Sequence, residues 1–300
     1  MPKGISVHIG VNNVDSAQYG SQFTVLKGCA NDARDMQGIA QSQALPQQFE
    51  TTLLIDSDAT SVRVINTIGE AAKRLEKDDM FLITFSGHGG KLRDPINGDE
   101  PDSQDETLVL YDRNLIDDEL YALWKRFEPG VRILFICDSC HSGTVAQVSP
   151  AEPVENPAAA EDEDGGFFGN NRPFLDENGE PRLIRTLSGW AQDNHEGKFQ
   201  EVYDAVRYPL TAKSKVKASV GASLIQISAC QDFELALDGT QNSLFTGMLL
   251  KVWANGAFEG DYHQFFEEIR TKTAPFRQNP NFFRVGVTNN DFESQRPFFI

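Results

Sequence analysis

The sequence predicts an α/β fold, a three-layer α/β/α sandwich around a mostly parallel central sheet. Four short runs are almost entirely apolar, at residues 5–11, 80–85, 131–137 and 224–229, and a weaker fifth run lies at 52–55. Continuous apolarity over strand length is typical of strands that are buried on both faces, as in a parallel sheet. Segments with helical periodicity separate these runs, so strands and helices alternate along the chain.

Helices are expected over residues 31–40, 61–75, 117–127, 243–254 and 262–272. The second of these segments has a clear amphipathic pattern, and Ser61 is suited to be its N-cap. Its apolar positions recur at helical spacing, and they are Val62, Ile65, Ile68, Ala72 and Leu75.

One stretch interrupts the alternation of strands and helices. From residue 146 to 220, proline, glycine, asparagine and acidic residues dominate, and a strong apolar periodicity is missing. This composition predicts a long, partly disordered insertion between the strands at 131–137 and 224–229. Residues 1–300 are therefore interpreted as a single domain that contains the insertion at 146–220.

Composition and charge limit the classes of partner. The net charge of −17 disfavours binding to nucleic acid or to anionic membranes, which both reward basic surfaces. No apolar run approaches the ~20 residues that a membrane-spanning helix needs, and the N-terminal segment lacks the pattern of a signal peptide. We expect a cytoplasmic protein that binds neither nucleic acid nor membranes.

Two of the predicted strands run directly into short polar motifs. The run at 80–85 continues into a motif that contains Ser86, His88 and Gly89, and the run at 131–137 continues into Asp138 and Cys140. Neighbouring parallel strands end at the same edge of a sheet, where α/β folds place their sites. A cysteine and a histidine that meet there can act as nucleophile and base. The backbone amides of Gly89 and Cys140 are well placed for a developing oxyanion.

Cys137 and Cys140 also form a Cys-x-x-Cys pattern, which raises zinc binding and redox chemistry as alternatives. Zinc would need a second pair of ligands, and neither Cys29 nor Cys230 brings one. Redox use needs two accessible sulfurs, whereas Cys137 belongs to an apolar run. Separate free thiols in a reducing compartment are the favoured interpretation.

The two motifs, SGHGG and DSCHSG, resemble those of the metacaspases and their bacterial relatives, the orthocaspases. His88 precedes Cys140 by 52 residues, and caspases place the histidine about 50 residues upstream of the cysteine. The similarity extends through LKGCANDARDM at 26–36 and ISACQDFELALDG at 227–239, so it covers most of the chain outside the insertion. It implies a caspase-like fold and a cysteine endopeptidase. The QACRG motif of the aspartate-specific caspases is absent.

The resemblance implies a role for each matching residue of the dyad. Cys140 would be the nucleophile and His88 its general base. His141 follows the nucleophile directly, but its side chain should point to the other side, so it is not assigned to the dyad.

The resemblance also implies a specificity pocket. Asp32 and Asp138 match acidic residues that line the primary pocket of the family, and Ser86 would form a third wall. Two carboxylates in a partly desolvated pocket require a cation, which implies cleavage after arginine or lysine. An alternative for Asp32 is that this residue, or Asn31, simply caps the helix that follows.

The sequence departs from the family at the calcium site that many metacaspases carry. Nine acidic residues and one arginine lie between positions 94 and 118, a local net charge of −8, and among them Asp105, Asp117 and Asp118 match three aspartates of that site. The expected fourth position is Gln147 here. Losing a carboxylate weakens a site for a hard cation. No cofactor is therefore expected to be required.

The resemblance further implies peptide or protein substrates with arginine or lysine at the cut site, and it favours a monomer. The alternative function is a non-catalytic caspase-like scaffold, which the presence of both dyad residues disfavours. An enzyme of this specificity that carries exposed basic residues on its own insertion is expected to cleave itself there. The candidate sites are Arg182, Arg185, Lys198, Lys213, Lys215 and Lys217, whereas Arg172 is disfavoured by the proline that follows it.

Overall fold

Six strands form the main sheet of the computed structural model, in the order β2-β1-β3-β7-β8-β9. All neighbouring strands are parallel except β8 and β9. The four strands at the centre are buried along almost their entire length, which explains their continuous apolar sequences. The bounds are β1 (Gly4–Gly10), β2 (Glu50–Ile55), β3 (Met80–Ser86), β7 (Arg132–Asp138), β8 (Ser223–Ser228) and β9 (Asn281–Gly286). The structure describes residues 2–20, 23–93, 104–140, 175–176, 178–187, 189–213, 220–231 and 236–300.

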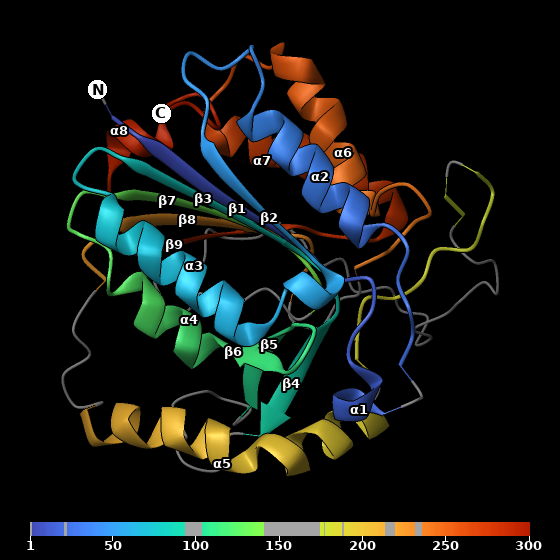
Figure 1. The fold of residues 1–300 in the computed structure, drawn as a ribbon. Helices are drawn as coiled ribbons and strands as arrows, with labels where there is room; N and C mark the ends of the chain where they lie inside the picture. The colour runs from blue at the N-terminus through green and yellow to red at the C-terminus, as the bar shows by residue number, and fades with distance from the viewer. Residues whose placement is uncertain are drawn as a thin grey trace, which may run out of the picture.

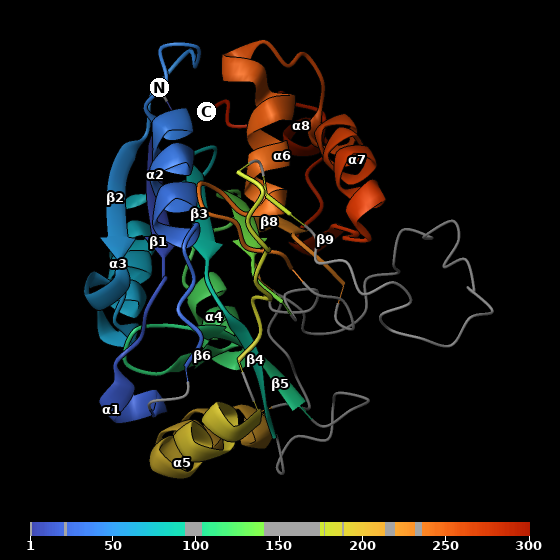
Figure 2. The same ribbon diagram turned by 90° about the vertical axis from the view of Figure 1, so that its right-hand side faces the viewer.

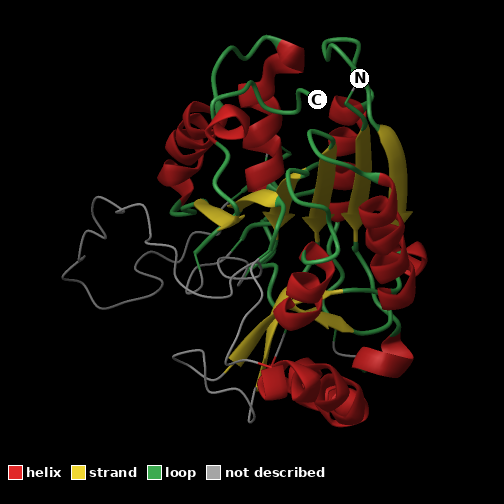
Figure 3. Cartoon of the chain, turned by 90° about the vertical axis from the view of Figure 1, so that its left-hand side faces the viewer, coloured by secondary structure: helices red, strands yellow, loops and turns green. Residues whose placement is uncertain are grey.

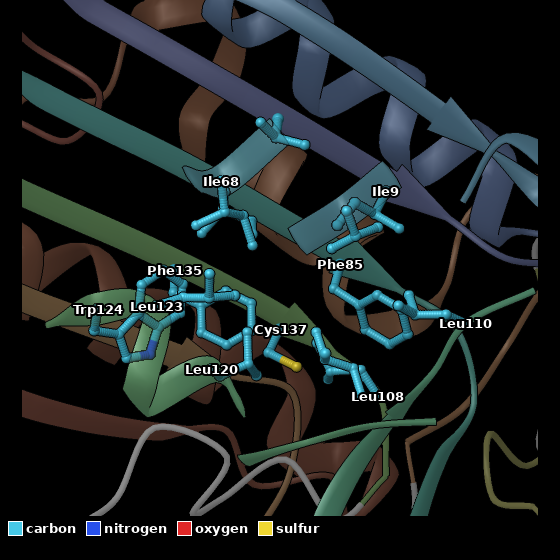
Figure 4. Packing of buried hydrophobic residues seen from close by; sticks show 14 of the residues in the cluster. Ile9, Ile68, Phe85, Leu108, Leu110, Leu120, Leu123, Trp124, Phe135 and Cys137 are labelled. Atoms are coloured by element: carbon cyan, nitrogen blue, oxygen red, sulfur yellow. The ribbon is translucent and has the colours of Figure 1, made fainter. Parts of the chain in front are cut away.

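Helices cover both faces of the main sheet (Figure 1). One face carries α2 (Cys29–Ala40), α6 (Leu244–Trp253) and α7 (Tyr262–Thr273), and the other carries α3 (Ser61–Arg74) and α4 (Asp117–Trp124). The apolar side chains on the two faces form two separate core clusters. Figure 4 shows part of the cluster beneath α3 and α4, where Ile68, Phe85, Trp124 and Phe135 are buried. The predicted three-layer α/β/α sandwich is therefore confirmed.

The start of α3 differs from the prediction by one residue. Thr60, and not Ser61, is the N-cap, and its side chain accepts a hydrogen bond from the Arg63 amide. The Ser61 hydroxyl instead donates to Asp112 Oδ2 at 3.0 Å, and its amide donates to Asp112 Oδ1 at 2.6 Å. Ser61 therefore ties the first turn of α3 to the loop before β6 (Asn114–Ile116).

A second, smaller sheet is not predicted by the sequence analysis. Its antiparallel strands β4 (Gly89–Arg93), β5 (Gln104–Val109) and β6 lie in the order β4-β5-β6. In Figure 3 this sheet lies between the main sheet and the long helix α5 (Gly189–Lys213). Among the residues that the structure describes, no helix has the length and apolarity to cross a membrane.

Helix α5 falls inside the insertion, where no helix is predicted from the sequence. It is held to the second sheet by His195, whose Nε2 accepts from the Asn114 amide at 3.1 Å and lies 2.9 Å from the Tyr203 hydroxyl. The His195 ring also stacks on Tyr19 at a centroid distance of 4.2 Å. This polar and aromatic anchorage explains why an apolar pattern does not reveal the helix. Residues 146–174 and 214–219 of the predicted insertion lie outside the described residues.

A buried histidine of the central sheet predicts acid sensitivity. The ring nitrogens of His8, on β1, lie 3.0 Å from Thr84 Oγ1 and 2.9 Å from Ser6 Oγ. Burial lowers the pKa of His8 from 6.5 to about 3. Below pH 6.5 His8 therefore binds a proton in the unfolded chain but not in the folded chain. The stability from neutral His8 is complete above that pH and is lost as the pH falls toward about 3.

We expect His8→Asn to reduce the loss of unfolding free energy between about pH 7 and about pH 5 by roughly 2 kcal/mol relative to wild type. Urea unfolding at the two pH values measures this difference. His263 is exposed, so His263→Asn serves as the matched control and should behave like wild type. Equal losses in His8→Asn and wild type would contradict the prediction.

Candidate active site

The two predicted motifs meet at the carboxyl edge of the main sheet. β3 and β7 are neighbours, in a register that pairs Ser86 with Asp138. Just beyond these strand ends, the backbone of Gly89 lies against that of Cys140. A Cβ atom on Gly89 would lie 1.7 Å from the Cys140 carbonyl oxygen, so only glycine permits this approach. The topology therefore brings the two motifs together as the sequence predicts.

Cys140 is fully buried, and its sulfur faces the loop that follows β8. The sulfur accepts a hydrogen bond from the Ala236 amide at 3.0 Å and lies 3.7 Å from the Ala236 carbonyl oxygen. Within the described part of the chain, no hydrogen bond joins the Cys140 sulfur to the His88 ring. The structure thus brings the backbones of the proposed dyad together, while the thiol is turned toward Ala236.

The Cys-x-x-Cys alternative receives no support from the structure. None of the four cysteines forms a disulfide, and all four are buried. Cys137 belongs to the core cluster beneath α3 and α4, where Figure 4 shows it beside Leu108 and Leu120. Cys140 belongs to the cluster on the opposite face. A redox pair needs two accessible, adjacent sulfurs, and these two lie in different layers of the core.

His88 is buried between the strand end and the loop before α2. Its Nε2 lies 2.7 Å from the Thr24 carbonyl oxygen, and its ring contacts Phe23 edge-on at 4.8 Å. A carbonyl only accepts, so Nε2 carries the proton and Nδ1, which has no hydrogen-bond partner among the described residues, keeps its lone pair. Burial lowers the pKa of His88 to about 4, against the opposing effect of the hydrogen bond to the Thr24 backbone. At neutral pH the ring is therefore neutral, which is the form a general base needs.

The three predicted pocket residues surround a side chain of the protein itself. Arg185 is completely buried, and its Nη1 donates to Ser86 Oγ at 2.7 Å and lies 3.1 Å from Asp138 Oδ1. Its Nη2 donates to Asp32 Oδ2 at 2.8 Å. The structure therefore brings Asp32, Ser86 and Asp138 together, as predicted, around a guanidinium group.

A fourth residue of this pocket is missing from the sequence-based prediction. Asp238 Oδ1 accepts from Arg185 Nη2 at 2.8 Å, and Asp238 is almost fully buried. Burial raises the pKa of Asp238, but the neighbouring Arg185 lowers it. The net effect is a pKa below the ordinary value of an aspartate. Burial lowers the pKa of Arg185, but the surrounding carboxylates raise it well above its ordinary value. We call the set Asp32, Ser86, Asp138 and Asp238 the arginine pocket.

The alternative interpretation of Asp32 as a helix cap is wrong. α2 begins at Cys29, its N-cap is Gly28, and no side chain caps it. Asp32 Oδ1 instead accepts from Asn242 Nδ2 and from the Ser243 amide, both at 3.1 Å. Its carboxylate therefore joins α2 to the loop before α6 and to the arginine pocket.

The backbone around Arg185 lies between Gly89 and the loop at 236–238, and we call this place at the strand ends the groove. The Arg185 carbonyl oxygen accepts from the Gly89 amide at 3.0 Å, and the Arg185 amide donates to the Ala236 carbonyl at 3.1 Å. On either side, the Leu187 amide donates to the Gly89 carbonyl at 3.0 Å, and the Asp238 amide donates to the Leu183 carbonyl at 2.7 Å. In Figure 2 this segment descends, in yellow, past β4 to α5. Residues 183–187 thus occupy the groove as an added, strand-like segment.

The three aspartates that match the calcium site of the family are wholly or partly buried. Asp105 and Asp117 are buried and Asp118 is half-buried, and the Asp118 amide donates to Asp117 Oδ1 at 2.9 Å. Across the described ranges, no three side chains of histidine, cysteine, aspartate or glutamate are grouped so that they could hold a metal ion. Gln147 lies outside the described residues. Independence from calcium stays a prediction.

The chain is similar to several known proteins. A family model described as "Caspase domain" matches residues 4–292. Metacaspase-1 of Botryotinia fuckeliana is 30% identical over 262 residues, which cover 82% of this chain and 58% of that protein. The chain spans about half the length of the curated metacaspases it matches.

Two solved structures are also similar. The crystal structure of a Geobacter sulfurreducens protein superposes with a TM-score of 0.78, at 38% identity and with 99% of both chains covered. The crystal structure of Caspase-1 from Spodoptera frugiperda has a TM-score of 0.54 at 14% identity and covers 95% of this chain and 86% of that chain, a similarity that concerns the fold alone.

Proposed function

Because the chain belongs to the caspase domain family, we propose that it is a cysteine endopeptidase that hydrolyses peptide bonds after arginine or lysine and that cleaves its own chain. Cys140 is the nucleophile, His88 is the general base, and the amides of Gly89 and Cys140 stabilise the oxyanion. One observation carries the proposal. The Arg185 side chain fills the arginine pocket, and its carbonyl oxygen accepts a hydrogen bond from the Gly89 amide.

The charge of the arginine pocket supports specificity for basic residues. Asp32, Asp138 and Asp238 all lie within 3.1 Å of the Arg185 guanidinium. Buried carboxylates are costly unless a cation pairs with them, so an arginine or lysine side chain is the ligand that this pocket requires. An aspartate or glutamate side chain would instead add a like charge to the same buried volume.

The Arg185–Thr186 peptide bond is the bond that this geometry presents for cleavage. Attack requires the Cys140 sulfur to leave the Ala236 amide and turn toward the Arg185 carbonyl carbon. His88 accepts the thiol proton and passes it to the Thr186 nitrogen as the carbon–nitrogen bond breaks, which leaves a thioester on Cys140. Water then hydrolyses the thioester, and this restores the thiol and leaves a carboxylate on Arg185.

Self-cleavage is expected to follow Arg185 among the six basic candidates of the insertion. Incubated wild-type protein should give a new N-terminus at Thr186, whereas Cys140→Ala should stay intact. Arg185→Gln should block this cut because a neutral side chain cannot neutralise the pocket. N-terminal sequencing of the fragments measures the position.

Lys198→Gln provides the matched control, since Lys198 lies in the same insertion, is exposed, and donates to the Ala17 and Gln18 carbonyl oxygens. This variant should be cut like wild type. Equal cleavage of wild type and Cys140→Ala, or no cleavage of either, would refute self-processing. Hydrolysis of an arginine peptide, assayed in parallel, tests the peptidase activity separately.

A further inference from the structure

A second arginine lies in the same groove, three residues before Arg185. The Arg182 side chain is half-buried, and its Nη1 donates to the Asp238 carbonyl oxygen at 3.2 Å and to the Asn242 carbonyl oxygen at 3.5 Å. These two acceptors belong to the backbone of the loop whose carboxylate, from Asp238, holds Arg185. The groove therefore contacts both arginines through one loop.

The backbone register fixes where the Arg182 side chain reaches. Ile184 pairs with Leu237 in an antiparallel bridge, and the Asp238 amide donates to the Leu183 carbonyl at 2.7 Å. Side chains alternate in direction along an extended segment, so the side chains of residues 182 and 184 are expected on one side and those of residues 183 and 185 on the other. A peptide that pairs with the loop in this register would place its fourth residue before the scissile bond at the Arg182 position.

The loop leaves space for a guanidinium because position 239 is glycine. A Cβ atom on Gly239 would lie 2.7 Å from Arg182 Nη1 and 2.4 Å from the Asn242 carbonyl oxygen. Contacts this short do not occur without displacement of one of the atoms. The missing side chain at Gly239 is therefore part of the surface on which Arg182 rests.

The chemistry of the two acceptors selects a cationic donor. Carbonyl oxygens only accept, and they bind charged donors about twice as strongly as neutral ones. Arginine carries several N–H groups in a planar fork, so one nitrogen can reach both carbonyls. Between the two arginines, Ile184 packs against the core cluster that contains Cys140 and Ala236. That position therefore favours an aliphatic side chain.

We propose that the Asp238 and Asn242 carbonyl oxygens, together with Gly239, form a second arginine-binding subsite, which reads the fourth residue before the scissile bond. We call it the upstream arginine site. The preferred substrates then carry arginine, any residue, an aliphatic residue and arginine, followed by the cut. This inference rests on the proposed function, because it assumes that residues 182–185 lie in the groove as a substrate does.

Fluorogenic tetrapeptides test the upstream arginine site on wild-type protein that has completed any cleavage of its own chain. The Arg-Leu-Ile-Arg peptide should have a kcat/KM about tenfold or more above that of Ala-Leu-Ile-Arg. Most of the difference should lie in KM, because the site is remote from the reacting bond. Glu-Leu-Ile-Arg should be poorer still, since a carboxylate faces two carbonyl oxygens.

Gly239→Ala is the variant that addresses the site directly. It should bring the ratio of the Arg-Leu-Ile-Arg and Ala-Leu-Ile-Arg rates toward one, and the rate for Ala-Leu-Ile-Arg reports whether the protein still folds and works. A ratio near one in wild type would overturn the upstream arginine site and leave the proposed function standing. If wild type hydrolyses no arginine peptide, the proposed function fails, and the site fails with it.

The chain itself offers an independent measurement. Arg182→Gln should slow the appearance of the Thr186 N-terminus by about tenfold relative to wild type, whereas Lys198→Gln should not change it. Unchanged self-cleavage in Arg182→Gln, with peptide selectivity also absent, would contradict the inference on both assays.

Discussion

Replacement of Cys140 by alanine is expected to lower kcat/KM for arginine peptides by roughly 10³-fold or more, because the variant has no group that can attack the carbonyl carbon. His88→Ala should cause a loss of similar size, since an unassisted thiol is mostly protonated and a poor nucleophile at neutral pH. The double variant should be little worse than either single variant, because the two residues act as one unit. Steady-state hydrolysis of a fluorogenic arginine peptide measures all three.

The matched control for this experiment is Cys137→Ala. Both sulfurs are buried, but Cys137 packs in the cluster beneath α3 and α4, whereas Cys140 faces the opposite layer. Both variants should lose about 1 kcal/mol of unfolding free energy, and only Cys140→Ala should lose activity. Turnover by Cys140→Ala comparable with that of Cys137→Ala would contradict the assignment of the nucleophile. A non-catalytic scaffold predicts instead that wild type and both variants are inactive.

The central sheet could be predicted because its strands are buried on both faces. Burial of this kind leaves a continuous apolar sequence, which is why β1, β3, β7 and β8 are recognisable within one or two residues of their bounds. The edge strand β9 is half-exposed, and the short strands of the second sheet carry glycine and acidic residues. β9 pairs with β8, a distant segment of the chain. The strands of the second sheet are short and partly polar, so the local sequence carries little information about them.

The arginine pocket could be predicted only in part. Asp32, Ser86 and Asp138 lie in or beside recognisable motifs at strand and helix ends. Asp238 lies in the 227–239 stretch that resembles the family, but it does not directly follow a strand. It reaches the pocket because its carboxylate accepts from the Lys27 and Gly28 amides, 211 and 210 residues away in the chain. Such contacts depend on how the loops close over the sheet, which periodicity does not encode.

The occupant of the pocket and the direction of the thiol are likewise properties of the folded chain. Arg185 is one of six basic residues that the sequence offers as cleavage sites, and nothing local separates it from the other five. Its selection depends on the backbone pairing of residues 183–187 with the groove. The contact of the Cys140 sulfur with the Ala236 amide depends on the loop after β8. Both features arise from tertiary packing.

Removal of one carboxylate from the arginine pocket should produce the second large effect. Asp32→Ala and Asp138→Ala are expected to lower kcat/KM for arginine peptides by roughly 10²-fold or more, as for a buried charge pair that loses one member. Asp138 also accepts from Thr246 Oγ1 at 2.6 Å at the start of α6, so its variant should lose stability as well. Neither change should create cleavage after aspartate, since two carboxylates would remain. Efficient hydrolysis of an aspartate peptide by wild type would overturn the pocket.

Asp238→Asn separates recognition of arginine from recognition of charge in general. The guanidinium contacts Asp238 and Asp32 through Nη2 and Ser86 through Nη1, a spread that one compact ammonium group cannot match. Wild type should therefore prefer arginine to lysine peptides. Asp238→Asn should lower kcat/KM for arginine peptides by about tenfold or more, and it should reduce the ratio of kcat/KM for arginine peptides to kcat/KM for lysine peptides. Asp58→Asn is the control, because Asp58 is exposed and pairs with Arg63 on the surface. If Asp238→Asn lowers both rates equally and keeps the ratio, Asp238 supports the loop without selecting arginine.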